Sequence, residues 1–182
     1  MLKKDCDRFT ETNIKLKNGN HVALRFLAVE DEEAFGDFYV SIERSAYRFY
    51  CPHPLTRENA RLRVDAALSP TVVGIVAINA MQHIVAFASF QWHVSDSGPG
   101  FFGICIQKQY RGLGLGKALM ERIAEIAKEV GPPVMSLTVQ KANPRAVVLY
   151  QKMGFRIIRE QMRNQVEEFP PEAEYYMERV VR

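Results

Sequence analysis

The chain has 182 residues, of which 47% are hydrophobic and 25% are charged, and a chain of this length and composition predicts one globular domain over residues 1–182. The formal net charge of +3 is too small to predict nucleic-acid binding, which usually needs basic residues gathered on one face. The longest apolar run, residues 72–80, is far shorter than the about 20 residues that cross a bilayer, so no membrane association is expected.

The cysteines and the first residues of the chain indicate the cellular compartment. Cys6, Cys51 and Cys105 are odd in number and widely spaced, which predicts neither a disulfide framework nor a zinc site. Residues 1–7 contain no apolar segment of the kind that a signal peptide needs. We therefore expect a protein of the reducing cytoplasm that binds no metal.

The chain begins with the pattern of a hairpin followed by a helix. Two β-prone runs, residues 14–16 and 22–27, flank Asn18-Gly19-Asn20, which is a strong turn signal. The acidic stretch at residues 30–33 predicts the first turn of a helix, because negative charge there complements the helix dipole.

A second helix is expected to begin near Thr56 and to end by Pro70, with Leu62 and Ala66 on one face. The segment between the two helices, residues 45–54, is rich in aromatic residues and proline. It is expected to be an ordered loop.

The middle of the chain predicts a second hairpin and a further strand. Residues 72–79 and 84–94 are β-rich runs joined by a short turn. Residues 95–100 form a cluster of turn-forming residues, and residues 101–106 then predict another strand.

From Leu115 the hydrophobic period changes from two to 3.6, which predicts a long amphipathic helix. Gly131 and the two prolines after it end that helix. The remaining expected elements are a strand at 134–139, a short helix at 144–153, and strands at 155–162 and 175–180. One mixed sheet with helices packed on it accommodates this order, so the predicted fold class is α/β.

The most informative segment is the glycine-rich turn at residues 109–117, QYRGLGLGK, between the strand at 101–106 and the long helix. Its three alternate glycines permit positive φ and a close approach of the main chain to a ligand. Because N–H groups at a helix start lack intrahelical partners, the turn predicts an anion site, to which Arg111 and Lys117 add positive charge. The alternative is a tight turn without a ligand, which the alternate glycines followed by lysine make the weaker interpretation.

The spacing of these glycines excludes two familiar phosphate-binding motifs. A dinucleotide fingerprint, G-x-G-x-x-G, would need glycine where Lys117 or Leu119 stands, and a P-loop fails at both of its ends. The pattern that does match is R-x-x-G-x-G, at Arg111, Gly114 and Gly116. In this respect the sequence resembles the GNAT superfamily of N-acetyltransferases, whose loop of this pattern holds the pyrophosphate of acetyl-coenzyme A.

A second segment supports the same resemblance. Residues 143–155, NPRAVVLYQKMGF, match that family's N-x-x-A-x-x-L-Y-x-x-x-G-F at every fixed position, and the resemblance covers roughly residues 72–180. It implies a single-domain GNAT fold, with a mixed, mostly antiparallel twisted sheet of about seven strands flanked by about four helices. Residues 1–70 would be the variable N-terminal part and residues 72–162 the acetyl-CoA-binding core.

The resemblance also implies the site, with acetyl-CoA as co-substrate. A bulge in the strand at 101–106 would direct main-chain groups of Ile104, Cys105 and Ile106 toward the thioester arm, and one N–H group would bond the thioester carbonyl. Tyr150 occupies the general-acid position, where a phenol protonates or hydrogen-bonds the departing thiolate. The other implied cofactor-binding residues are Arg111, Gly112, Leu113, Gly114, Leu115, Gly116, Lys117 and Asn143.

Several of these residues have a purely structural alternative. The side chains of Ile104 and Ile106 suit core packing, and Tyr150 would also serve as an amphipathic core residue on its helix. Asn143 stands just before a proline at a helix start, which is a typical N-cap position. Capping is compatible with a contact to the cofactor.

The general base is the least defined part of the predicted site. Many relatives carry a glutamate on the strand that corresponds to residues 101–106, whereas this strand holds no carboxylate. His93 is the candidate, because an imidazole ordinarily titrates near neutrality, with Asp96 beside it. A water chain to the solvent is the alternative. Cys105 is less favoured as a nucleophile, because direct transfer is the family's usual route.

The sequence therefore predicts an enzyme, an N-acetyltransferase that transfers acetyl from acetyl-CoA directly to a primary amine of a small molecule or peptide. The acceptor is expected near residues 35–50 and 167–171. The alternative is a non-catalytic acyl-CoA binding or sensing module, which the missing carboxylate leaves open and Tyr150 argues against. Neither nucleic acid nor membrane is an expected partner, and a homodimer is left open.

Overall fold

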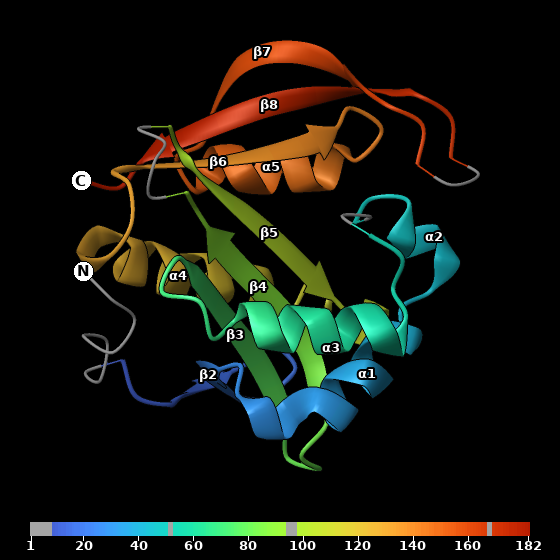
Figure 1. The fold of residues 1–182 in the computed structure, drawn as a ribbon, viewed down its shortest axis with the longest axis vertical. Helices are drawn as coiled ribbons and strands as arrows, with labels where there is room; N and C mark the ends of the chain where they lie inside the picture. Colours follow the sequence, from blue (N-terminus) through green and yellow to red (C-terminus); the bar gives the residue numbers. More distant parts are fainter. Residues whose placement is uncertain (1–8, 51–52, 94–97, 167–168) are drawn as a thin grey trace.

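One mixed sheet runs through the computed structural model, which describes residues 9–50, 53–93, 98–166 and 169–182 (Figure 1). Its eight strands lie in the order β1-β2-β3-β4-β5-β6-β8-β7. All neighbouring strands are antiparallel except β5 and β6, which are parallel. The predicted α/β class with a mostly antiparallel sheet is confirmed, with one strand and one α-helix more than the approximate numbers expected.

The first part of the described chain confirms the predicted hairpin and both helices. Gly19 has φ of 89° in the hairpin turn, a conformation that glycine adopts without strain. Thr56 caps the second helix, because its Oγ1 accepts a hydrogen bond from the N–H of Asn59 at 3.2 Å. The elements are β1 (Thr12–Lys15), β2 (His21–Phe26), α1 (Glu32–Val40), α2 (Arg44–Tyr47) and α3 (Arg57–Ala66).

Two details of this part differ from the prediction. The segment expected to be a loop begins with the short helix α2, whose Ala46 and Tyr47 are buried against the rest of the protein. Leu62, expected on the apolar face of α3, is 59% exposed, and Ala60 and Val64 are buried instead. Positions 60 and 64 are four apart and lie on one helical face, whereas position 62 lies on the opposite side.

The remaining elements agree with the prediction to within a few residues. The fourth strand ends three residues early, and the expected turn at 95–100 lies partly outside the described residues. These elements are β3 (Val72–Asn79), β4 (Ile84–Gln91), β5 (Gly100–Ile106), α4 (Leu115–Glu129), β6 (Val134–Gln140), α5 (Pro144–Lys152), β7 (Arg156–Arg163) and β8 (Glu172–Val180).

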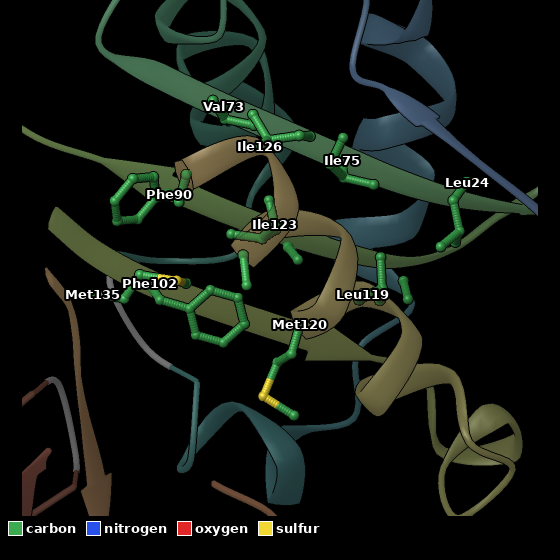
Figure 2. Packing of buried hydrophobic residues seen from close by; sticks show 14 of the residues in the cluster. Leu24, Val73, Ile75, Phe90, Phe102, Leu119, Met120, Ile123, Ile126 and Met135 are labelled. Atoms are coloured by element: carbon green, nitrogen blue, oxygen red, sulfur yellow. The ribbon is translucent and has the colours of Figure 1, made fainter. Parts of the chain in front are cut away.

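Hydrophobic packing covers the sheet on both faces. On one face α1 and α3 lie over β3, β4 and β5, with Phe35 and Tyr39 packed near Phe87 (Figure 1). On the other face α4 packs over the same strands. Burying each large apolar side chain contributes about 1.5–3 kcal/mol, so α4 is held firmly and its first turn has a fixed position. Figure 2 shows this packing, with Leu119, Met120, Ile123 and Ile126 of α4 against Leu24, Val73, Ile75, Phe90, Phe102 and Met135.

The parallel strands β5 and β6 stay together only at their beginning. They pair at Gly100 with Met135 and at Phe101 with Ser136, whose Oγ donates a hydrogen bond to the carbonyl of Gly100 at 3.2 Å. Beyond these residues the two strands diverge, and β6 pairs along its whole length with β8 (Figure 1). The later half of β5 therefore has β4 on one side and no strand on the other.

Candidate functional site

The divergence of β5 from β6 leaves main-chain groups of β5 without a strand partner. The N–H of Gln107 donates to a carbonyl of β4 at 3.0 Å, so the main chain of Gln107 faces β4. Because these groups alternate in direction along an antiparallel strand, those of Ile104 and Ile106 face the diverging side. The carbonyl of Ile106 accepts a hydrogen bond from Nε of Arg111 at 2.8 Å. The N–H groups of Ile104 and Ile106 remain available to a ligand between the strands.

No bulge in β5 is responsible for this exposure. The register of β5 against β4 runs without a shift from Phe101 to Ile106, and the irregularity in this part of the sheet lies between Ala77 and Ile78 on β3. The bulge that the family resemblance implied is therefore absent from β5. The loss of the β6 partner exposes the main chain instead.

Cys105 differs from its two neighbours on β5. By the same alternation its main-chain groups face β4, and its buried side chain lies on the face covered by α1 and α3. Burial raises the pKa of its thiol to about 12, against an opposing effect of Arg111. The side chain is a neutral thiol at physiological pH, which does not suit a nucleophile.

The glycine-rich turn presents a row of unpaired main-chain donors. Among the described residues, no N–H group from Gly112 to Lys117 donates a hydrogen bond, and the first bond of α4 runs from the Ala118 N–H to the Gly114 carbonyl. Gly112 and Gly114 have φ of 75° and 94°, so both positions require glycine. The turn has the free donors and the positive helix end that bind phosphate groups.

The other residues of the turn hold it in place or add charge. Leu115, the first residue of α4, is fully buried, and the carbonyl of Leu113 accepts a hydrogen bond from the N–H of Lys17 at 3.1 Å. Arg111 is exposed but tied to the end of β5, and Lys117 is exposed on the first turn of α4. Both cations lie beside the free N–H groups.

Helix α5 contributes the second pair of predicted residues. Asn143 is its N-cap, because Oδ1 accepts a hydrogen bond from the N–H of Ala146 at 3.4 Å. The ring of Tyr150 packs edge-on against Phe155, with centroids 5.9 Å apart. Its hydroxyl forms no hydrogen bond with another described residue.

Tyr150 is a neutral hydrogen-bond donor at physiological pH. Burial raises the pKa of Tyr150 to about 12, and Cys105 raises it further. Helix α5, which carries Tyr150, lies close to the start of α4 and the end of β5, because a Cβ at Gly116 would contact both Leu149 of α5 and Ile106 of β5.

His93 is not brought into this group. It is exposed and lies past the end of β4. Ser89 stands opposite Gly103 on β5, and His93 follows it by four residues. At the rise of extended chain this separates His93 from the level of Gly103 by about 13 Å, in the direction away from Ile104 and Ile106. Asp96 lies outside the described residues. The role of His93 as general base stays a prediction.

Sequence reasoning missed a polar cluster on the face covered by α1 and α3. Its members are Tyr39, Tyr50, His53, Arg63 and Gln91, which we call the Arg63 cluster. The Tyr39 hydroxyl lies 3.1 Å from Nε2 of His53, and Nη1 of Arg63 donates a hydrogen bond to Oε1 of Gln91 at 3.1 Å. These residues come from α1, the segment after α2, α3 and β4, so no local spacing in the sequence connects them.

Two kinds of feature are absent from the residues that the structure describes. No group of three or more His, Cys, Asp or Glu side chains could hold a metal ion. No helix is long and apolar enough to cross a membrane.

Comparisons with known proteins agree with this arrangement. Residues 31–155 match the Acetyltransferase (GNAT) family, which is more than half of the chain. The chain is 25% identical to the L-amino acid N-acetyltransferase AaaT of Escherichia coli K12 over 147 residues, 76% of this chain and 85% of that protein. It is 33% identical over 54 residues to the [ribosomal protein bS18]-alanine N-acetyltransferase of the same organism, 30% of this chain and 36% of that protein.

A solved structure shares the fold and carries the expected co-substrate. The protein yncA of Salmonella typhimurium, solved with its cofactor acetyl-CoA, superimposes with a TM-score of 0.73, covering 88% of this chain and 94% of that one. The two sequences are 18% identical, so this likeness shows the fold alone. The chain therefore belongs to the acetyltransferase (GNAT) family, and it is an acyltransferase.

Proposed function

We propose that this enzyme transfers the acetyl group of acetyl-CoA directly to the primary amine of a small molecule or peptide. The observation that carries the proposal is the divergence of β5 from β6. It leaves the N–H groups of Ile104 and Ile106 without a strand partner, beside the glycine-rich turn, whose Arg111 is hydrogen-bonded to the carbonyl of Ile106. The names of the two relatives support a primary amine, since one refers to amino acids and the other to an alanine of a ribosomal protein.

Different residues of this chain would bind different parts of acetyl-CoA. The N–H groups from Gly112 to Lys117, with Arg111, would hold the pyrophosphate of acetyl-CoA. The N–H groups of Ile104 and Ile106 are suited to the pantetheine arm, and one of them would donate to the thioester carbonyl. A fixed donor at that oxygen stabilises the negative charge that develops when the amine attacks. Asn143 stands at the same side of the sheet, at the start of α5.

The reaction forms a C–N bond and breaks the C–S bond. Tyr150 would donate a hydrogen bond to the departing sulfur. With a pKa of about 12 it is a weaker acid than an ordinary thiol, at about 8.5, so it stabilises the thiolate more readily than it gives up its proton. The proton of the attacking amine leaves to a base, for which His93 and a water chain to the solvent are the two candidates.

A Tyr150→Phe substitution tests this proposal. Losing a hydrogen bond to a charged sulfur costs about 1.5–3 kcal/mol, so thiol release should fall by about one to two powers of ten. The dissociation constant of acetyl-CoA should change less than threefold, because the phenol is not needed to hold the phosphates. Calorimetry with acetyl-CoA and CoA measures binding, and thiol release is followed with amino acids, polyamines, aminoglycosides and lysine peptides.

The matched control is Tyr176→Phe on β8, whose hydroxyl donates to Glu178 at 2.8 Å. It should leave both binding and turnover unchanged. Micromolar binding without thiol release from any acceptor would favour the non-catalytic binding module instead. A wild-type protein that binds no acetyl-CoA would contradict the roles given to the glycine-rich turn.

A further inference from the structure

The Arg63 cluster borders the part of β5 where the strands diverge. Gln91 pairs with Phe101 on β5, and residues directly opposite in an antiparallel pair lie on the same face. Gly103 follows on that face, two residues along the strand. The ring of Tyr50 covers it, with Cε2 at 3.7 Å from where a Cβ of residue 103 would stand. The cluster thus extends from Gly103 to the first residues of β5, on the side opposite α5.

Arg63 is the cation of this cluster, and the groups around it are neutral. Burial, with a smaller contribution from Arg63, lowers the pKa of His53 to about 4. Burial raises the pKa of Tyr39 to about 12 and that of Tyr50 well above its usual value. At physiological pH the cluster therefore has one positive charge beside uncharged hydrogen-bonding side chains.

No carboxylate of the described residues neutralises this charge. Arg63 is half-buried, and its hydrogen-bond partner Gln91 is an uncharged amide. Arg25 shows the contrast, because it is also half-buried and its Nη1 and Nη2 each donate to Asp31 at 2.6 Å. A partly desolvated guanidinium has five donors in a planar fork that matches a carboxylate.

A structural role for Arg63 is the alternative. It lies in the last turn of α3, where a cation interacts favourably with the helix dipole. That role predicts an effect of substitution on stability alone. It predicts no dependence on the chemistry of the acceptor, so the two roles are separable by experiment.

We propose that Arg63, assisted by Gln91 and the Tyr39–His53 pair, binds a carboxylate of the acceptor, so that the acceptors are amino acids with an amine and a carboxylate close together. The inference rests on the proposed function, since it assigns the acceptor class of the same site. The positive charge would also lower the pKa of a nearby amine, which favours its neutral, nucleophilic form. For the same reason the cluster disfavours polyamines, whose additional cations Arg63 would repel.

The first arm of the test uses acceptors that differ only at the carboxylate. Leucine is compared with leucinamide and isoamylamine, and methionine and phenylalanine are compared with their amides and decarboxylated amines. The expected kcat/KM for at least one amino acid is a hundredfold or more above that of its amide and its amine. Amides or simple amines that react as well as the amino acids would overturn the inference and leave the proposed function standing.

The second arm uses Arg63→Met and a matched control on the same helix. Arg63→Met should lower kcat/KM for amino acids about a hundredfold, at least tenfold more than it lowers kcat/KM for simple amines, and it should leave the affinity for acetyl-CoA within threefold. Arg61→Met removes an exposed arginine that contacts Glu32 at 4.0 Å, and it should change none of these quantities. An equal loss with all acceptors would assign Arg63 a structural role and overturn the inference.

A second variant keeps the test valid if Arg63→Met fails to fold. Gln91→Glu places a carboxylate beside Arg63 with little change in size, so it should raise the melting temperature while lowering kcat/KM for amino acids at least tenfold. Unchanged amino-acid activity in Gln91→Glu would contradict the inference. Acetyl-CoA binding without thiol release from any acceptor would instead contradict the proposed function, on which the inference depends.

Discussion

His53 and Tyr39 are held together between the helices of the N-terminal part and the sheet, and both stay neutral there. The His53 imidazole has its pKa lowered to about 4 by burial and by Arg63, and its Nε2 lies 3.1 Å from the Tyr39 hydroxyl. Tyr150, on the other side of the diverging strands, is neutral because burial raises its pKa to about 12. Tyr39, His53 and Tyr150 are thus uncharged, whereas Arg63 and Arg111 are cations in this part of the molecule.

The His53 pKa gives a prediction about stability. Below pH 6.5 the unfolded chain protonates this histidine while the folded chain does not, so its contribution to stability is complete above pH 6.5 and is lost as pH falls toward 4. Unfolding free energies from urea titrations between pH 7.5 and pH 4.5 should therefore fall more steeply for wild type than for His53→Gln. The control is His83→Gln, an exposed site, which should keep the wild-type slope. Parallel curves for wild type and His53→Gln would show that the imidazole is not desolvated.

At the scale of single elements, α4 and the turn before it were the most predictable part of the molecule. The 3.6-residue period fixed the buried stripe of α4, and Leu115, Leu119 and Ile123 are all fully buried. The alternate glycines indicated an anion site, and the structure shows its free N–H groups. In contrast, the apolar face of α3 was predicted wrongly. Leu62 is more hydrophobic than Ala60, and the prediction therefore placed Leu62 inside, whereas the structure buries the smaller Ala60 and exposes Leu62.

The start of α4 also provides a prediction that separates binding from folding. A Cβ at Gly116 would lie 3.4 Å from Ile106 and 3.5 Å from Leu149, which is ordinary contact, and φ there is not positive. Gly116→Ala should therefore not lower the melting temperature, since alanine favours a helix by about 1 kcal/mol over glycine. It should weaken acetyl-CoA binding at least tenfold in calorimetry, because the added methyl group would narrow the space between the first turn of α4, Ile106 and Leu149, beside which the pyrophosphate and the pantetheine arm are proposed to lie.

Gly19→Ala, in the β1–β2 turn, should show the opposite behaviour. Gly19 has φ of 89°, so alanine there is strained and the melting temperature should fall, while acetyl-CoA affinity stays unchanged. Wild-type affinity in Gly116→Ala would show that the phosphates do not lie against α4.

At the scale of the whole molecule, the decisive feature is the divergence of β5 from β6, and no local pattern in the sequence predicts it. β6 pairs with β8 along its whole length and β5 pairs with β4, whereas the edge that β5 and β6 share is paired only at Gly100 and Phe101. The two sequence motifs pointed to Arg111, Gly114 and Tyr150, whose roles stay predictions. They did not show which of Ile104, Cys105 and Ile106 face it, because that depends on strand register. The Arg63 cluster was also beyond prediction, since four separate segments assemble it.

A titration of ¹⁵N-labelled protein with acetyl-CoA, followed by amide chemical shifts, tests whether the co-substrate binds where β5 diverges from β6. We predict the largest changes at the amides from Gly112 to Lys117 and at Ile104 and Ile106, with a smaller change at Cys105, whose N–H faces β4. Changes confined to another site, such as the pocket lined by His21 and Gln82, would contradict this prediction, as would the absence of any change.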